Sequence, residues 1–391
     1  MRAFLIWLYR ERRLYKHNTK EVFKITISFP HMGDYHVPIA AFLRRLFPEA
    51  IVTAAPPITK ETAAIGQRHS PDFICEPFKY NMGNFIQALE GGADVLFQTG
   101  MGCRFGYYGE LQEQILKDLG YEFNFICLAR DRAGPRPAYT ALRKLGSPVS
   151  ATRMAYALLL AAEGIRAMDK LSALIRENMA LTDYPKELLS EYEIFLKELK
   201  NADSLAKIYA LTDKHEKSLR SMTKDRRIDR PLRVGIVGDL YTVMEPFGNF
   251  DIERKLASRG VIISRKMSVS FLLFGEAKYR RLRKTCGYLR YSGGANGLDS
   301  VAQSISYARA GYDGVIHVKS FGCTPELNAI PAMVRISRDL NIPILHLSFD
   351  THFSETGLDT RLEAFRDMME MRRKASGGHI QSGGRCGVRL H

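Results

Sequence analysis

Short apolar strand patterns alternate with amphipathic helix patterns in two separate parts of this chain, and this alternation limits the fold more than any other feature. In the first part, strands are predicted at residues 23–29, 50–54, 93–98 and 122–127, with helices at 37–46, 84–89 and 110–119. In the second part, strands are predicted at 232–237, 261–264, 314–318 and 342–347, with helices at 252–258, 327–340 and 358–373. Strands and helices in this rhythm form βαβ units with parallel pairing. The chain is therefore expected to be an α/β protein.

The residues between the two series have a different composition. Ala, Leu, Glu and Lys dominate residues 138–221, and glycine is scarce there, which indicates a bundle of helices or a helical cap. We therefore predict two Rossmann-like parallel-sheet domains with a helical segment between them. The predicted parts are a first α/β domain at 1–137, the helical segment at 138–228, a second α/β domain at 229–375 and a mobile basic tail at 376–391.

The chain is basic, with 57 Lys and Arg against 42 Asp and Glu. The positive residues are densest at 220–233, at 278–290 and from 372 onward, without interleaved aromatics or a known nucleic-acid motif. Solvated basic surfaces are the simplest interpretation, with an anionic ligand or an acidic partner as the alternative and no specific nucleic acid. No apolar stretch approaches the roughly 20 residues of a membrane span and no secretory signal is present, so a cytoplasmic protein is expected.

Three of the six cysteines share a distinctive setting. Cys103 follows the predicted strand 93–98, Cys323 follows the predicted strand 314–318, and Cys75 is expected where strand character ends at a proline turn. Open α/β sheets bind ligands at the carboxyl ends of their strands, so a group shared by these thiols would lie in the cleft between the domains. Zinc is not favoured, because CxxC pairs and neighbouring histidines are lacking. Three thiolates suit a 4Fe–4S cluster with one open iron, and three ordinary loop cysteines are the alternative.

Two glycine-containing loops follow or precede predicted elements. Gly235 to Asp239 comes after a strand and is faintly similar to a dinucleotide-binding turn, but the third glycine is missing, so a tight βα turn is favoured over nucleotide binding. Gly293 and Gly294 lie in a loop before a predicted helix that begins near Asp299. The backbone N–H groups of that loop would form an anion-binding nest, or the loop is simply flexible.

Several distinctive segments occur in a fixed order along the two α/β series. The second series contains FGCTPE around Cys323, NIPIL from Asn341 and ETGLDTRLEAF from Glu355, with the glycine pair upstream. The first series contains CEPFK from Cys75, followed by Gly83. Together these segments resemble the 2-hydroxyacyl-CoA dehydratase / CoA-activase-related family, and the CEPFK segment is similar to that family's N-terminal element. The resemblance covers residues 23–127 and 231–373 and leaves the helical middle unmatched.

The resemblance implies a 4Fe–4S cluster held by Cys75, Cys103 and Cys323. It further implies low-potential electrons from a separate ATP-dependent activator protein, used for radical dehydration of a 2-hydroxyacyl-CoA or for reduction of a small molecule. A double-cubane cluster would need further thiolates from Cys127 or Cys286, and a form without a cluster is a further alternative. The resemblance also implies a homodimer or a heterodimer with a related subunit, and a non-catalytic subunit of such an assembly is the second hypothesis.

Other residues near the three cysteines would tune or serve such a cluster. Lys79 and Arg104 would add positive charge, which raises the reduction potential. Glu76 and Glu326 each flank a cysteine–proline turn and are predicted either to transfer protons near the open iron or to stabilise the turn. His31 ends the first predicted strand and is expected to act in proton relay or substrate binding, or to pack in its loop.

Overall fold

The computed structural model describes residues 24–99, 103–127, 143, 147–222, 230–275, 287–289 and 294–376. Gly293, Cys286 and the predicted tail beyond residue 376 therefore lie outside the described residues. No helix in these described ranges has both the length and the apolar character needed to cross a membrane.

Two four-stranded sheets, each parallel throughout, confirm the predicted α/β fold. The first contains β1 (Thr26–Phe29), β2 (Ile51–Ala54), β3 (Val95–Gln98) and β4 (Asn124–Cys127) in the order β2-β1-β3-β4. The second contains β5 (Leu232–Gly238), β6 (Val261–Arg265), β7 (Gly314–Ser320) and β8 (Ile344–Phe349) in the order β6-β5-β7-β8. In each sheet the second strand lies on one side of the first strand and the third strand lies on its other side. The switch point of each sheet is therefore between its first and third strands.

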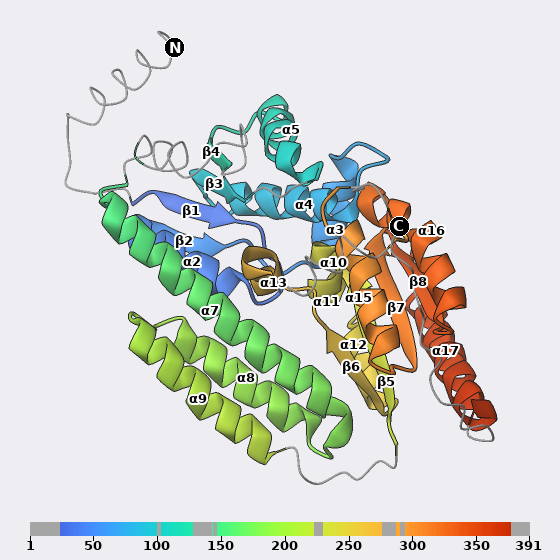
Figure 1. The fold of residues 1–391 in the computed structure, drawn as a ribbon. Coiled ribbons are helices and arrows are strands. Elements are labelled where there is room, and N and C mark those ends of the chain that lie inside the picture. Colours follow the sequence, from blue (N-terminus) through green and yellow to red (C-terminus); the bar gives the residue numbers. More distant parts are fainter. Residues whose placement is uncertain are drawn as a thin grey trace, which may run out of the picture.

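Helices flank both sheets (Figure 1). Those that accompany the first sheet are α2 (His36–Leu46), α3 (Lys60–Arg68), α4 (Glu76–Glu90) and α5 (Phe105–Asp118). Those that accompany the second are α10 (Leu240–Met244), α11 (Pro246–Asn249), α12 (Ile252–Ser258), α13 (Val269–Phe274), α15 (Gly297–Arg309), α16 (Thr324–Asp339) and α17 (Glu355–Ser376).

A group of helices lies between the two series, as the composition predicts. It comprises α7 (Ala151–Asn178), the short 3-10 turn η2 (Met179–Leu181), α8 (Pro185–Leu199) and α9 (Leu205–Ser221). The green helix α7 packs against α2 of the first sheet domain and against β6 of the second (Figure 1). Its buried Met168 and Leu171 belong to the same apolar core as Val234 and Ile263 of the second sheet. Apolar burial therefore joins the helical segment to the second sheet domain.

Helices α4, α5 and α16 are among those that begin earlier than their apolar patterns predict. Helix α4 begins at Glu76 rather than at residue 84, α5 begins at Phe105, and α16 begins at Thr324. In α4 and α16, proline occupies one of the first two helical positions. Proline is favoured there because its missing N–H would have no partner inside the helix. These added first turns place the cysteine-bearing segments at helix N-termini.

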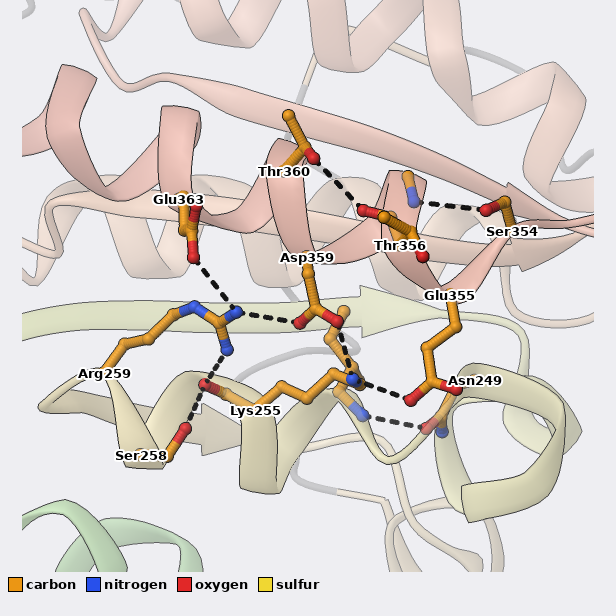
Figure 2. Close-up of polar contacts among 12 residues, drawn as sticks. Asn249, Lys255, Ser258, Arg259, Ser354, Glu355, Thr356, Asp359, Thr360 and Glu363 are labelled. Atoms are coloured by element: carbon orange, nitrogen blue, oxygen red, sulfur yellow. Dashed lines mark hydrogen bonds and ion pairs between the residues drawn. The ribbon is translucent and has the colours of Figure 1, made fainter.

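A network of charged side chains fastens α17 to α12 (Figure 2). Lys255 Nζ lies 2.8 Å from Glu355 Oε1 and 2.9 Å from Asp359 Oδ2. Arg259 Nη2 lies 2.8 Å from Asp359 Oδ1 and 3.6 Å from Glu363 Oε1. The hydrogen bond from Lys255, followed by that from Arg259, lowers the pKa of Asp359. Asp359 is therefore the carboxylate that both cations share.

We expect Asp359→Asn to cost about 0.5–1 kcal/mol of stability at pH 7, the range of a solvent-screened ion-pair network. Because the folded-state pKa of Asp359 is lowered, its contribution is fully present above the ordinary aspartate pKa and is lost as the pH falls through the lower folded-state pKa. Urea unfolding of both proteins at pH 7 and at about pH 2.5 measures this difference. Asp367→Asn, on the exposed face of the same helix, is the matched control. An equal difference at both pH values would contradict the role of the Asp359 charge.

Candidate functional site

Two of the three singled-out cysteines occupy equivalent places in the two sheets. Cys103 follows β3 and Cys323 follows β7, and these strands are the third members of sheets with the same strand order. Both cysteines therefore lie at the carboxyl end of the strand that borders its sheet's switch point, where open α/β sheets bind ligands.

The prediction for Cys75 was partly wrong. No strand precedes it, because residues 69–75 run from the end of α3 through turns, and Cys75 is the N-cap residue of α4. Cys323 is likewise the N-cap of α16. In both segments a helix begins one residue after the cysteine, and the sequence Cys-x-Pro marks this start. The helix brings Cys75 to the same region as the strand-end loops.

The Cys75 and Cys323 segments touch each other although they belong to different sheet domains. A Cβ atom on Gly322 would lie only 3.0 Å from the Cys75 backbone nitrogen. The two segments therefore pack backbone against backbone at a residue without a side chain. The backbone N–H of Glu76 donates a 2.8 Å hydrogen bond to Ser320 Oγ. The backbone N–H of Ser320 in turn donates a 2.7 Å hydrogen bond to Asp239 Oδ2. Ser320 and Asp239 thus support the contact from the second domain.

The N-terminal turn of α5 contacts all three cysteine segments. Arg104, the N-cap residue, donates from Nη2 to Gly322 O at 2.6 Å and to Thr324 Oγ1 at 2.8 Å, on either side of Cys323. The Phe105 N–H donates to Cys103 Sγ at 3.4 Å. The Tyr108 hydroxyl lies 2.8 Å from Cys75 Sγ. One helical turn therefore joins the three sulfur-bearing loops.

Burial dominates the electrostatics of the three thiols. It raises the pKa of Cys75 to about 12, although the hydrogen bond with Tyr108 opposes this shift. Burial also raises the pKa of Cys103 and of Cys323, and the nearby carboxylate of Asp239 adds to all three shifts. Cys103 contributes to the shift of Cys75, and Cys75 to that of Cys323, so the thiols are mutual neighbours. Such thiols stay protonated at neutral pH unless a cation binds their thiolates.

Glu76 is a buried carboxyl group beside the cysteine contact. It is 3% exposed, and its Oε1 atom forms a 2.7 Å ion pair with Lys79 Nζ. Its Oε2 atom is buried without a hydrogen-bond partner among the described residues. Burial raises the pKa of Glu76, although Lys79 opposes this. Lys79, which was predicted to add positive charge beside the cysteines, therefore pairs with Glu76.

Glu326 begins a hydrogen-bonded chain of titratable side chains. Its Oε2 atom lies 2.9 Å from His317 Nε2, and both side chains are fully buried. His317 Nδ1 lies 2.9 Å from Nδ1 of His346, which lines a surface cavity of about 440 Å³. Burial, then His317, lowers the pKa of His346 to about 4. These hydrogen-bonded side chains connect the N-terminal turn of α16, next to Cys323, with solvent at the edge strand β8.

His31 lies at a contact between the two sheet domains. Its backbone N–H donates to Asn84 Oδ1 at 2.9 Å, and its carbonyl accepts a 3.0 Å hydrogen bond from the Tyr241 hydroxyl. Its ring stacks on His36 at 4.6 Å. Burial, then His36, lowers the pKa of His31 to about 4, so the ring is neutral at pH 7. These contacts support the packing alternative, and none of them joins His31 to the three cysteine segments.

The two glycine loops have different surroundings. Gly294 has a φ of +92°, and a Cβ there would lie 3.7 Å from the Pro325 side chain. A Cβ on Gly297 would lie 2.2 Å from Pro325 O, so the start of α15 packs directly on the first turn of α16. Gly238 has a φ of +150°. Asp239 Oδ1 caps α10 through the Thr242 N–H at 2.9 Å, in agreement with a tight βα turn.

Within the described ranges, no three His, Cys, Asp or Glu side chains are grouped as ligands of a single metal ion. A cubane cluster places its thiolates on separate irons, so its ligands stand farther apart than those of one ion. Cys75, Cys103 and Cys323 are half-buried neighbours, and their sulfur atoms are the donor type that an iron–sulfur cluster requires. A scan of the chain against protein-family models found no match, and a search of curated proteins found none.

Proposed function

We propose that the chain is an iron–sulfur protein whose 4Fe–4S cluster is held by Cys75, Cys103 and Cys323 between the two sheet domains. In this proposal a separate ATP-dependent activator supplies low-potential electrons. The chain uses them for radical dehydration of a 2-hydroxyacyl-CoA or for reduction of a small substrate. The reaction class is taken from the resemblance of the sequence motifs alone, because no family model and no curated protein matched the chain.

The observation that carries the proposal is the meeting of the three cysteine segments at the first turn of α5. Arg104, Phe105 and Tyr108 each contact a different segment, and the Cys75 and Cys323 segments also touch directly. A cluster bound there would supply single electrons at low potential. Three protein thiolates leave one iron for a substrate oxygen or another small ligand.

The nearby carboxyl groups of Glu76 and Glu326 would donate and accept protons during the reaction. Burial raises the pKa of Glu76 while the ion pair with Lys79 opposes this shift, and its Oε2 atom has no partner in the described part of the chain. Such a group suits the donation of a proton to a departing hydroxyl. Glu326 would exchange protons with solvent through His317 and His346, since its hydrogen-bonded chain ends at the surface cavity.

Anaerobic purification followed by iron and sulfide analysis tests the cluster. We expect about four irons and a broad absorption band near roughly 400 nm, typical of thiolate-bound clusters. Cys323→Ala should lose most of this iron. Cys127→Ala is the matched control, because Cys127 is the last residue of β4 and belongs to none of the three segments. Equal iron in the two variants, or no iron in the wild-type protein, would overturn the assignment.

The reaction class needs a second measurement on the iron-loaded protein. A 2-hydroxyacyl-CoA is mixed with protein that has been reduced by a low-potential chemical reductant, and the release of 2-enoyl-CoA is followed by chromatography. We expect product with the wild-type protein and none with Cys323→Ala. Iron-loaded, reduced protein that neither dehydrates this substrate nor perturbs its cluster spectrum on mixing would contradict the dehydratase assignment and favour a non-catalytic subunit.

A further inference from the structure

Tyr108 is a buried residue whose hydroxyl has a cysteine sulfur as its neighbour. Its side chain is 4% exposed, and its hydroxyl lies 2.8 Å from Cys75 Sγ. The ring is held in place by an edge-on contact with Phe78, at 4.9 Å between ring centroids, and by a tilted contact with Phe105 at 5.4 Å. The hydroxyl is therefore aimed at the sulfur by a rigid aromatic cluster.

The direction of this hydrogen bond depends on what the sulfur carries. Between a neutral thiol and a phenol, either group can donate. A sulfur bound to iron has no proton, so the Tyr108 hydroxyl would have to be the donor. The other sulfur contact of this turn is the Phe105 N–H to Cys103 Sγ, which is longer, at 3.4 Å. Tyr108 thus makes the shorter of the two contacts.

We propose that Tyr108 is a positioning residue that raises the reduction potential of the cluster by donating a hydrogen bond to Cys75 Sγ. A donor aimed at a ligand sulfur stabilises the more negative, reduced state more than the oxidised one, because the reduced state places more negative charge on its sulfurs. Removing the donor should make the one-electron couple more negative. This inference rests on the proposed function, since it requires a cluster on Cys75.

Tyr108→Phe tests the inference, because it removes the hydroxyl and keeps the ring packed against Phe78 and Phe105. The probe is a potentiometric titration of the anaerobic protein with redox mediators, followed by electron paramagnetic resonance, in which dithionite supplies the single electron that each cluster accepts. We expect unchanged iron and a roughly tenfold lower ratio of reduced to oxidised cluster at a fixed potential, equal to about 59 mV for one electron. Tyr107→Phe, the exposed neighbour on α5, should leave the potential unchanged.

The outcomes separate this inference from the function on which it rests. Full iron content with the wild-type potential in Tyr108→Phe would overturn the role of Tyr108 and leave the cluster assignment standing. A shift of the same size in Tyr107→Phe would also overturn it, because the effect would then not depend on the Cys75 contact. Absence of iron from the wild-type protein would overturn the proposed function and this inference together.

Discussion

Gly83→Ala is expected to destabilise the protein by at least about 3 kcal/mol, at the upper end of what overpacking costs. Helices α3 and α4 cross with their backbones in contact at this residue. A Cβ on Gly83 would lie 2.0 Å from Thr62 O, and one on Gly66 would lie 1.8 Å from Lys79 O. Neither carbonyl belongs to a flexible side chain, so the helices would have to separate.

The effect of Gly83→Ala should appear as a lower urea midpoint for the first sheet domain and as reduced iron incorporation, because Cys75 is the N-cap residue of α4. Gly164→Ala is the matched control within another helix. The nearest atom to its Cβ would be Leu199 Cδ1 at 3.8 Å, an ordinary contact. That variant should be unchanged or up to about 1 kcal/mol more stable, since alanine favours helices. A wild-type midpoint for Gly83→Ala would show that α3 and α4 do not cross this closely.

His317→Leu should also have a large effect, a loss of about 3 kcal/mol. His317 is the hydrogen-bond partner of Glu326 Oε2, and Oε1 of the same carboxyl group already lacks a partner among the described residues. Without the histidine, a fully buried carboxyl group would have neither water nor a protein donor. Urea unfolding of the second sheet domain measures the loss.

A double variant separates the lost hydrogen bond from lost packing. Replacing both partners, His317→Leu with Glu326→Leu, removes the buried polar group as well as its partner. We expect it to be more stable than His317→Leu alone, because no unsatisfied carboxyl group remains. His346→Leu is the control for the solvent-side end of the Glu326–His317–His346 hydrogen bonds. It should lower the free energy of unfolding by less than His317→Leu does, because His346 is only half-buried. If the loss in the double variant equalled the sum of the losses in His317→Leu and Glu326→Leu measured separately, Glu326 and His317 would not be coupled.

The two-sheet architecture could be predicted from the sequence because its signals are local. Apolar runs such as 93–98 and 314–318 fall in β3 and β7, and the helix at 252–258 coincides with α12. The starts of α4 and α16 were missed because apolar periodicity begins only where a helix packs against the core. The first turns of these helices are specified by proline, which a search for apolar periodicity does not detect.

The site could be predicted only in part, because its partners come from distant positions. The three cysteines were singled out from their loops, but Ser320, Asp239 and His317 join the site through contacts that no spacing in the sequence reveals. Tyr108 did leave a signal. Positions 104, 105 and 108 lie on one face of a helix that starts there, so placing the start of α5 correctly would have brought Tyr108 to the cysteines.

The two sheet domains are held together differently on their two sides. On the side of α7, the Asp169 carboxylate accepts hydrogen bonds from the Tyr35 hydroxyl and, at 2.8 Å, from the Ser270 N–H. One carboxylate therefore joins a loop of the first domain to α13 of the second, beside a large apolar core. On the cysteine side, hydrogen bonds such as those of Arg104 are accompanied by a smaller apolar cluster, in which Tyr80 of the first domain packs with Tyr241 of the second.

This asymmetry determines how the molecule can open. Helix α7 has 28 residues, about 42 Å of rigid helix, and separating the domains there would expose apolar surface. On the other side the apolar cluster is smaller, and water can replace the hydrogen bonds that break, so separation there would cost less. The domains are therefore expected to rotate about an axis near α7, as hinged bodies do. Such a rotation would move the Cys75 and Cys323 segments apart, because they lie on the side opposite the axis. A bulky ligand could then enter while the two sheets stayed intact.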